Sequence, residues 1–479
     1  MLFSMVSEGK KQNGRRPARH VHLVGIGGSG MSAIAWVLLG RGYTVSGSDM
    51  QTNSRTDELA ANGAVIYSGH AAANVHQADV LVVSSAIPAT NPELAAARTA
   101  GVPILKRADF LGRLMAGQTG VTVAGSHGKT TTTGMIVQIL QVAEKDPSVI
   151  VGGDMPALGR NGRAGRHPIF VIEADEYDYM FLGLKPDIAV VTNVEHDHPD
   201  MFPTLADYTA AFQEYVALLP AGGHLIVSAD DAGALELVHI APSGVTISTY
   251  GLNESSHPAA NHHLVAVDTR PNPLGGTDFL VQRDDQIAGL VRLRVPGEHN
   301  VRNALAAIAA CWPLDCSWSA MQEGLSSFGG ITRRFQVIGE AGDVTVIDDY
   351  AHHPTEIQAT LAAARQRYPG RRLWAVWQPH TYSRTQLLQD RFAESFQDAD
   401  LVVALDIYRS RETNSLGIST AAVVAQMQHP YVRHIGRHED AAAYILDRVR
   451  PGDIVLTLGA GDGNVVGQFV LDGLQDVFR

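Results

Sequence analysis

Short apolar runs alternate with longer amphipathic stretches along most of the chain. Near the N-terminus the runs VHLVGIG, YTVSGSD, AVIYSG, VLVVSSAI and VPILKRA enclose helix-like segments over 32–39 and 93–100. Apolar runs of this length, separated by amphipathic segments, are typical of parallel strands joined by crossover helices. Residues 20–115 are therefore predicted to form a Rossmann-like α/β domain.

The same alternation returns twice further along the chain. A second block contains VTVAG, IFVIEAD, IAVVTNV and HLIVSAD and closes with the helical pattern NVRNALAAIAACW. A third contains VTVIDDY, LWAVWQP, LVVALDIY and DIVLTLGAG, with EIQATLAAARQRY as an intervening helix. These patterns predict a central α/β domain over 116–330, with a mainly parallel sheet, and a C-terminal Rossmann-like domain over 331–479. The stretch 252–285, rich in Asn, His, Pro and Gly, is predicted to be a loop or an irregular hairpin.

Composition narrows the class of protein. The 479 residues are 45% hydrophobic and 18% charged, with a net charge of −12, so generic binding to nucleic acid or to a membrane is not expected. Two cysteines cannot build a disulfide framework or a Cys-based metal site, which fits a reducing compartment. Residues 1–19 are basic and polar and lack an apolar signal core, so they are predicted to be a disordered leader of a cytoplasmic protein. A monomer or weak homodimer is expected.

A first glycine-rich loop follows the first predicted strand. The residues from Gly25 to Gly30 fit G-x-G-x-x-G, and Asp49 ends the next strand about twenty residues further on, as in a dinucleotide-binding fingerprint. Glycines at these positions let the backbone approach a diphosphate at a helix N-terminus. The loop therefore predicts a ligand with a diphosphate next to a ribose, without specifying a nicotinamide.

A second glycine-rich loop, GSHGKT, begins at Gly125 after the strand VTVAG. Lys129 is placed to reach the β- and γ-phosphates of a nucleotide, and the Thr130 hydroxyl is placed to ligate Mg²⁺. Val123 stands where the usual P-loop pattern has its first glycine, so this is a shortened variant. The combination of strand, G-K-T and helix predicts an ATP site.

Acidic and imidazole side chains follow two other strands of the same block. FVIEADEYD places Glu173 just past a strand, and VVTNVEHDHPDMF places His196 and His198 similarly. Such groups facing a P-loop suit Mg²⁺ held partly by protein and partly by phosphate. Zinc is the competing metal, because the two histidines lie two residues apart, but no third His or Cys ligand is evident in the sequence.

Six motifs occur in one order along the chain: AGSHGKTTTT, EADEYD, TNVEHDHPD, GEHNVRNALAA, RRFQ and DDYAHHPTE. Over roughly residues 20–475 the chain resembles the Mur ligase family, and the opening HLVGIGGSGMSAIA is similar to its alanine-adding branch. The resemblance implies three domains, for a UDP-sugar, ATP and an amino acid. It also implies that the lactyl carboxylate of UDP-N-acetylmuramate takes the γ-phosphoryl group of ATP. L-alanine then attacks the acyl phosphate, which leaves an amide, ADP and phosphate.

The resemblance also implies roles for individual residues. The residues implied to contact the UDP-sugar are Gly27, Gly28, Ser29, Gly30, Met31, Asp49, His70, Ser84, Ser85 and Arg107. Those implied to contact ATP are Gly125, Ser126, His127, Gly128, Lys129, Thr130, Thr131, Asn300, Asn303 and Arg334. The implied catalytic residues are Lys129, Glu173, His198, Arg334 and Asp349, and the implied amino-acid pocket is Tyr350, His352, His380 and Arg384. Thr130 and Glu173 resemble the ligands of one Mg²⁺, and Glu173 and His198 those of a second.

Two departures from the family pattern stand out. The alanine-adding pattern usually reads P-H-R-Y-T-R-T, whereas this chain has PHTYSRT, so Thr381 replaces an arginine and puts a second contact to the amino-acid carboxylate in doubt. Several relatives also carry a carbamylated lysine in the helix after HDHPD. Phe212 takes that place here, as expected of the alanine-adding branch.

Four other functions are compatible with parts of the sequence. A family member that adds a peptide in cell-wall recycling shares most central motifs, and folylpolyglutamate synthetase shares the ATPase block but not the fingerprint block. A nicotinamide dehydrogenase fused to an ATPase would explain both glycine-rich loops. A non-enzymatic P-loop switch needs neither flanking domain.

Overall fold

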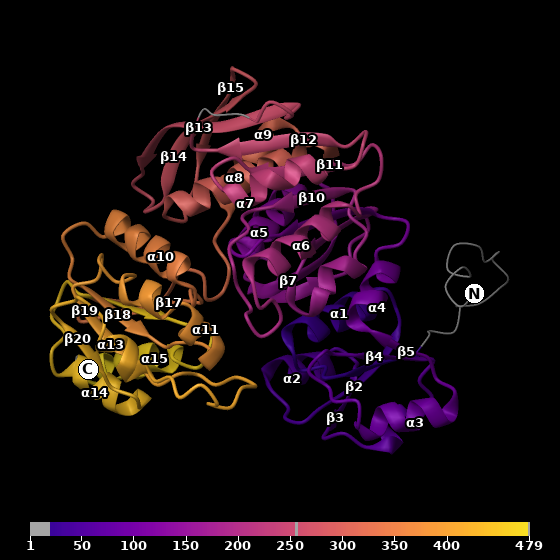
Figure 1. Ribbon diagram of the computed structural model, residues 1–479, viewed down its shortest axis with the longest axis horizontal. Coiled ribbons are helices and arrows are strands. Elements are labelled where there is room, and N and C mark those ends of the chain that lie inside the picture. Colours follow the sequence, from indigo (N-terminus) through magenta and orange to yellow (C-terminus); the bar gives the residue numbers. More distant parts are fainter. Residues whose placement is uncertain (1–19, 254–256, 478–479) are drawn as a thin grey trace.

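The computed structural model describes residues 20–253 and 257–477, and the predicted leader over 1–19 lies outside these residues. The described chain forms three α/β domains, each built on its own sheet (Figure 1), so the predicted three-domain α/β fold is confirmed. In the figure the first domain is indigo, the central domain runs from purple to salmon, and the third is orange to yellow. None of the described helices combines the length and apolar character needed to span a bilayer.

The first domain is a five-stranded parallel sheet in the order β3-β2-β1-β4-β5. Because the order reverses between β1 and β4, the loops after these two strands open onto a crevice where ligands bind in such folds. The strands are β1 (His20–Val24), β2 (Thr44–Asp49), β3 (Val65–Ser68), β4 (Val80–Val83) and β5 (Ile104–Lys106). The helices are α1 (Ser29–Gly40), α2 (Ser54–Ala61), η1 (Ala72–Val75), α3 (Pro92–Ala100) and α4 (Arg107–Leu114).

The central domain has a ten-stranded sheet in the order β15-β14-β13-β12-β11-β10-β6-β9-β7-β8. Apolar clusters cover both faces, which is why its inner strands read as continuous apolar runs. The strands are β6 (Thr119–Ala124), β7 (Ser148–Met155), β8 (Arg160–Arg163), β9 (Ile169–Glu173), β10 (Ile188–Val191), β11 (His224–Ser228), β12 (Thr246–Gly251), β13 (His262–Pro271), β14 (Thr277–Arg283) and β15 (Gln286–Arg292). The helices are α5 (Lys129–Val142), η2 (Tyr177–Gly183), α6 (Leu205–Val216), α7 (Ala232–Glu236), η3 (Leu237–Ile240), α8 (Glu298–Cys311), η4 (Trp312–Leu314) and α9 (Trp318–Ser327).

The stretch 252–285 is not simply a loop. β13 and β14 pair antiparallel across it, with a register shift between Val267 and Arg270 that marks a bulge. The hairpin alternative is therefore correct and the loop alternative is wrong. The strands were hard to recognise in the sequence because turn-forming residues interrupt their pattern. The hairpin is irregular and lies toward one edge of the sheet.

The third domain has a six-stranded sheet in the order β16-β17-β21-β18-β19-β20, parallel except for β16. The strands are β16 (Gln336–Ala341), β17 (Val344–Asp349), β18 (Leu373–Trp377), β19 (Leu401–Ala404), β20 (Val432–His434) and β21 (Ile454–Leu458). The helices are α10 (Pro354–Arg367), α11 (Tyr382–Leu387), α12 (Gln389–Ala393), α13 (Thr420–Val424), α14 (His438–Leu446) and α15 (Asn464–Val477).

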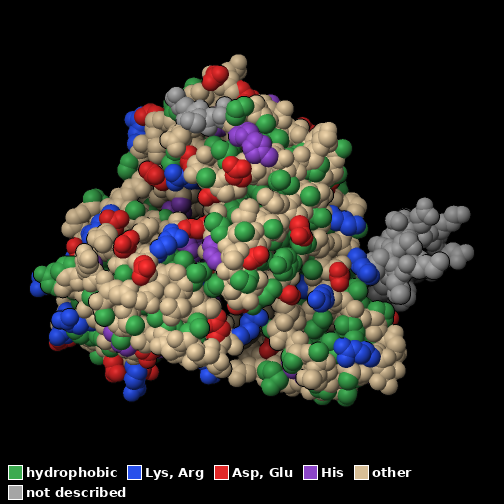
Figure 2. Space-filling model, viewed as in Figure 1, with side chains coloured by type: hydrophobic (Ala, Val, Ile, Leu, Met, Phe, Trp, Pro, Cys, Tyr) green, Lys and Arg blue, Asp and Glu red, His purple; other side chains and the backbone are tan. Residues whose placement is uncertain are grey.

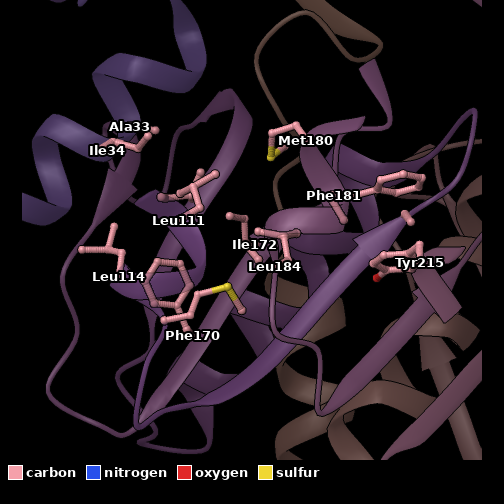
Figure 3. Close-up of a cluster of buried hydrophobic side chains, with 14 of the residues drawn as sticks. Ala33, Ile34, Leu111, Leu114, Phe170, Ile172, Met180, Phe181, Leu184 and Tyr215 are labelled. Atoms are coloured by element: carbon pink, nitrogen blue, oxygen red, sulfur yellow. The ribbon is translucent and has the colours of Figure 1, made fainter. Parts of the chain in front are cut away.

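The first and central domains share one continuous apolar core. Side chains of α1 and α4, such as Ile34 and Leu111, belong to the same cluster as Phe170 and Ile172 of β9 (Figure 3). The backbones approach closely as well, because a Cβ at Gly162 of β8 would collide with the backbone of Ala33 in α1. Because they share this buried apolar core, the two domains pack together as one unit.

The third domain keeps separate apolar clusters on the two faces of its own sheet. Several of its contacts with the central domain are made by charged and imidazole side chains. Figure 2 shows histidine and charged side chains where the third domain, on the left, meets the central domain above it. Ion pairs therefore help to hold the third domain against the central domain.

Candidate active site

All three domains contribute side chains to one cavity of about 730 Å³. Ser29 and Arg107 come from the first domain, Lys129 and Glu173 from the central domain, and His380 from the third. The N-termini of α1 and α5 both open onto it, since Gly28 and Gly128 precede these helices and line the cavity. Two helix N-termini facing one cavity offer two places for phosphate groups.

The second glycine-rich loop folds tightly between β6 and α5. Gly125 and Gly128 have φ angles of +133° and +81°, where other residues are strained. The His127 backbone N–H donates to Asn193 Oδ1 over 2.8 Å, and the Thr192 hydroxyl donates to the His127 carbonyl oxygen over 2.5 Å. Hydrogen bonds to Thr192 and Asn193, the two residues just after β10, therefore fix the conformation of the loop.

Lys129 is held by a buried carboxylate at the start of η2. Its Nζ donates to Glu176 Oε2 and Oε1 over 2.8 and 3.1 Å, and the Tyr208 hydroxyl also donates to Glu176. Burial alone would lower the pKa of Lys129, but Glu176 and Asp175 raise it above its ordinary value. Lys129 is thus a fully charged cation at the mouth of the phosphate loop.

Thr130 and Glu173 lie together as the sequence predicts for a shared Mg²⁺. The Thr130 hydroxyl donates to Glu173 Oε1 over 3.0 Å, and the Gly152 N–H donates to Glu173 Oε2 over 2.6 Å. Burial raises the pKa of Glu173 above its ordinary value, in opposition to Lys129. A buried carboxylate and a hydroxyl beside a phosphate loop are the oxygen donors that Mg²⁺ prefers, so these residues fit the ion.

His198 also lines the cavity, but its nearest carboxylate is that of Glu176, 3.6 Å from its Nε2. The ring of His196 instead forms a 2.7 Å hydrogen bond with the Phe202 carbonyl oxygen. Within residues 20–253 and 257–477, the group of three possible metal ligands is His127, Glu195 and His353, which contains neither His196 nor His198. The zinc alternative therefore finds no third ligand beside these two histidines among the described residues.

Part of the first glycine-rich loop faces the cavity and part is turned inward. Gly28, Ser29, Gly30 and Met31 line the cavity with Ser84, Ser85 and Arg107. The Gly27 N–H donates instead to Asp49 Oδ2 over 2.9 Å, so that carboxylate braces the loop. His70 Nδ1 lies 3.2 Å from Oε2 of the buried Glu93, and His70 does not line the cavity.

Several residues expected near ATP lie behind the phosphate loop. Asn303 accepts from the Thr132 hydroxyl, and its Nδ2 donates to Asn300 Oδ1. A Cβ on Gly128 would lie 2.6 Å from Asn303 Oδ1, so α8 packs directly against the loop. Gly125, Thr131, Asn300, Asn303 and Asp349 are outside the cavity lining, whereas Ser126, His127 and Arg334 are within it.

Arg334 and Asp349 meet where the third domain begins. Arg334 Nη1 lies 3.4 Å from Glu356 Oε1, and its guanidinium lies over the Tyr350 ring. Asp349 accepts from the backbone N–H groups of Phe335 and Ala351, both over 2.7 Å. Burial raises the pKa of Asp349 to about 6 against these contacts and the charge of Arg334. Asp349 therefore shapes the segment that carries Arg334 and Tyr350.

Four polar side chains of the third domain form one wall of the cavity: Tyr350, His352, His380 and Arg384. The rings of His352 and His380 are 5.8 Å apart. Burial lowers the pKa of His352 to about 4 and that of His380 to about 2. Both imidazoles are therefore neutral near pH 7, and Arg384 is the fixed cation of this wall.

Arg384 is joined to the central domain by a buried ion pair. Its Nε donates to Asp197 Oδ1 over 2.7 Å, and each side chain is 3% exposed. Its Nη1 lies 3.0 Å from His380 Nδ1. Despite burial, the charge of Arg384 holds the pKa of Asp197 well below its usual range. The predicted amino-acid arginine is thus also a contact between two domains.

A second contact between these domains centres on the phosphate-loop residue His127. Its Nε2 lies 3.1 Å from Glu195 of the central domain, and its Nδ1 lies 3.4 Å from Glu356 of α10. Glu195 is also bonded to the Thr355 hydroxyl and to Arg391 of the third domain. Burial would lower the pKa of His127, but the two carboxylates raise it from 6.5 to about 9.

We expect the His127 contact to weaken at alkaline pH. Because the folded-state pKa lies above the unfolded value, the stabilisation is complete below about pH 6.5 and is lost as the pH rises through about 9. The shift limits this contribution to about 3 kcal/mol. Wild type should therefore lose more thermal stability than His127→Gln between about pH 6.5 and about pH 9.5. Equal losses in the two proteins would show that His127 is not protonated in the folded state.

Comparison with known proteins places the chain in a family. Three family models match successive parts of it: "Mur ligase family, catalytic domain" at residues 20–119, "Mur ligase middle domain" at 123–311 and "Mur ligase, glutamate ligase domain" at 333–461. The chain belongs to the Mur ligase family. The sequence-based resemblance is thereby confirmed, and with it the prediction of an ATP-dependent ligase.

Individual Mur ligases resemble the chain over nearly its whole length. A UDP-N-acetylmuramate–L-alanine ligase from Roseiflexus sp. is 44% identical, with 95% of this chain and 99% of the relative covered. A crystal structure of a UDP-N-acetylmuramate–alanine ligase from Thermotoga maritima superposes with a TM-score of 0.77 at 28% identity, covering 96% and 99% of the two chains. A murein peptide ligase from Psychrobacter arcticus superposes with a TM-score of 0.70 at 26% identity, covering 96% and 100%.

The structure of this Mur ligase also brings in residues beyond the site residues that the resemblance implied. Asp197, Glu176 and Glu356 each hold a cation that lines the cavity, and Arg411 lines it from a loop after β19. The position of Glu356 could have been recognised from the sequence as part of a helix-capping pattern. It is the third residue of a helix whose N-cap is His353. Arg411 has no such pattern, since it lies outside every recognised motif.

Proposed function

We propose that the protein joins L-alanine to the lactyl carboxylate of UDP-N-acetylmuramate and converts ATP to ADP and phosphate. The observation that carries this proposal is the single cavity at which two phosphate-binding loops meet a wall of neutral imidazoles and arginine. Relatives named for this reaction match over nearly the full chain. One cavity can hold all three substrates in contact, which an amide-forming ligase requires.

Each domain supplies one substrate site in this proposal. The first domain, residues 20–115, holds the diphosphate of the UDP-sugar on Gly28 to Met31, with Ser84, Ser85 and Arg107 beside it. The central domain, residues 116–330, holds ATP on the loop before α5, with Asn300 and Asn303 supporting the loop from behind. The third domain, residues 331–479, holds L-alanine beside Tyr350, His352, His380 and Arg384.

The chemistry requires charge neutralisation more than covalent help from side chains. A carboxylate becomes an acyl donor when it takes the γ-phosphoryl group, and the alanine amine then displaces phosphate from the acyl phosphate. Lys129 and Arg334, which both line the cavity, are assigned to neutralise the phosphoryl oxygens during this transfer. The neutral His352 and His380 let the amine approach without repulsion from an imidazolium.

Mg²⁺ is included in the proposal because the donors fit it. Thr130 and Glu173 would hold one ion, and Glu173 and His198 are assigned to a second, with His198 Nε2 3.6 Å from Glu176 Oε1. When bound, Mg²⁺ would neutralise charge that develops on the phosphate oxygens during the transfer. Asp49 and His70 do not line the cavity. We assign them an indirect role, in which they support the residues of the sugar site.

The decisive experiment is ADP release measured with purified protein and Mg²⁺. We expect ADP only when UDP-N-acetylmuramate and L-alanine are both present, and none after chelation of Mg²⁺ with EDTA. Replacing L-alanine by the peptide L-Ala-γ-D-Glu-meso-diaminopimelate distinguishes the peptide-adding alternative. A fluorescence titration with NADH distinguishes the nicotinamide alternative. ATP hydrolysis by the protein alone, at a rate unaffected by either substrate, would contradict the ligase proposal.

Two further properties complete the proposal. We propose a cytoplasmic enzyme, since ATP and the UDP-sugar are used together at one cavity, and a monomer or weak homodimer. Cell fractionation and sedimentation velocity test these two statements.

A further inference from the structure

Six arginines line the cavity, and their charges are not equally available to a substrate. Five of them lie within 4 Å of a carboxylate of the protein. These pairs are Arg55 with Asp154 at 3.5 Å, Arg107 with Asp175 at 3.2 Å, Arg333 with Asp348 at 2.9 Å, Arg334 with Glu356 at 3.4 Å, and Arg384 with Asp197 at 2.7 Å. The sixth is Arg411.

Arg411 has no carboxylate within ion-pair distance in the part of the chain that the structure describes. Its guanidinium instead lies over the ring of Tyr177 in the central domain, 5.0 Å from the ring centroid. Tyr177 in turn packs edge-on against His198, at 5.1 Å between centroids. Arg411 is therefore a cation of the cavity wall that lies beside Tyr177 and His198 and has no direct ion pair among the described residues.

The loop that carries Arg411 is fixed to the loop that carries Thr381. The Thr381 N–H donates to the Tyr408 carbonyl oxygen over 2.9 Å, and the Tyr408 N–H donates to the Pro379 carbonyl oxygen over 2.8 Å. Glu412 accepts from the N–H groups of Tyr382 and Ser383 over 2.6 and 2.9 Å. The two loops thus form one rigid unit at the start of α11, and both Thr381 and Arg411 line the cavity.

We propose that Arg411 binds the α-carboxylate of L-alanine and supplies the cation that position 381 lacks in this chain. The inference rests on the proposed function and deepens it. Arg384, the other arginine of this wall, already donates its Nε–H to Asp197. A second guanidinium, with no ion pair to a carboxylate among the described residues, gives the substrate carboxylate a charge-assisted hydrogen bond that Thr381 cannot give.

The alternative anions in the cavity are less suited to Arg411. The diphosphate and the ATP phosphates each have a glycine-rich loop and a helix N-terminus of their own in the first and central domains. Arg411 belongs to the third domain and is tied through Tyr408 to His380, whose ring stacks on Tyr408 at 5.6 Å. Its position is thus set by the wall assigned to the amino acid.

The test compares L-alanine with L-alaninamide, which lacks the carboxylate. Arg411→Ala should raise the KM for L-alanine by about 10- to 100-fold, as expected for loss of a charge-assisted contact. It should leave the KM values for ATP and UDP-N-acetylmuramate within about twofold, and it should remove most of the preference for L-alanine over L-alaninamide. Arg411→Lys should retain part of that preference because it keeps the charge.

Two further variants sharpen the test. Arg409→Ala removes an arginine from the same loop that does not line the cavity, and it should behave as wild type. Thr381→Arg in the Arg411→Ala background should restore a low KM for L-alanine. A wild-type enzyme that forms no ADP with L-alanine would overturn the proposed function itself. An active wild type whose KM for L-alanine is unchanged in Arg411→Ala, or whose KM for the UDP-sugar rises instead, would overturn only the assignment of Arg411.

Discussion

Replacing Lys129 with alanine is expected to lower kcat by about 10²- to 10³-fold or more, because it removes the cation that the proposal assigns to the transferred phosphoryl group. Binding of the UDP-sugar, measured by calorimetry, should be retained, because the loop before α1 that is assigned to it lies in another domain. Retained turnover together with lost UDP-sugar affinity would reverse the roles of the two glycine-rich loops.

The structure shows why this variant needs a control. Glu176 is 1% exposed and depends on Lys129 for its charge partner, so alanine leaves a buried carboxylate without a cation. Part of any loss could then come from destabilisation. The double variant Lys129→Met with Glu176→Gln removes both charges while keeping similar volumes. It should recover thermal stability relative to Lys129→Ala while kcat stays low.

Breaking the Asp197–Arg384 pair is expected to have the second largest effect. Removing one partner of a buried ion pair usually costs about 3–5 kcal/mol, because the other charge is left buried and unpaired. Here the partners belong to different domains, so the protein can avoid that cost by separating them. Asp197→Ala should therefore disfavour contact between the third and central domains, lower kcat and raise the KM for L-alanine by about tenfold or more. Small-angle scattering should show a larger radius of gyration.

An ion pair within the third domain and a double variant of the pair between domains serve as controls. They distinguish loss of contact between the domains from loss of general stability. Asp453→Asn weakens the pair of Arg372 and Asp453, at 2.6 Å within the third domain, and should lower the melting temperature without changing the radius of gyration. Asp197→Ala combined with Arg384→Ala should restore compactness relative to Asp197→Ala alone. Strictly additive effects of the two substitutions on compactness would show that the pair does not join the domains.

Much of the secondary structure could be predicted from local pattern. The inner strands of all three sheets lie beneath helices on both faces, so they appear as uninterrupted apolar runs such as VTVAG, LWAVWQP and DIVLTLGAG. The irregular hairpin of β13 and β14 has no such pattern, because a bulge and turn-forming residues interrupt its alternation. Sequence pattern therefore located the strands of the first domain, including its edge strands β3 and β5, but it missed β7 and β12 inside the central sheet.

The phosphate loops were predictable because their chemistry is local. Close approach of backbone to phosphate demands glycine at fixed spacing, and Lys129 and Thr130 are neighbours of that loop in the chain. The pairing of Thr130 with Glu173 was also foreseen, since both follow adjacent strands, β6 and β9, of one parallel sheet. Residues at the same edge of a sheet must lie close together, whatever separates them in sequence.

Contacts across the domain boundary were decided by the tertiary structure alone. The sequence by itself determined the three α/β domains, the two phosphate loops and the family. It gave no indication that Asp197 would neutralise Arg384 across 187 positions, or that Glu195 and Glu356 would share His127. Nor could it show that Arg411 has no ion-pair partner within residues 20–253 and 257–477, because the availability of a charge depends on every group packed around it. The physical reason is that an ion pair between domains has no periodicity and no fixed spacing, and forms only where separately folded surfaces meet.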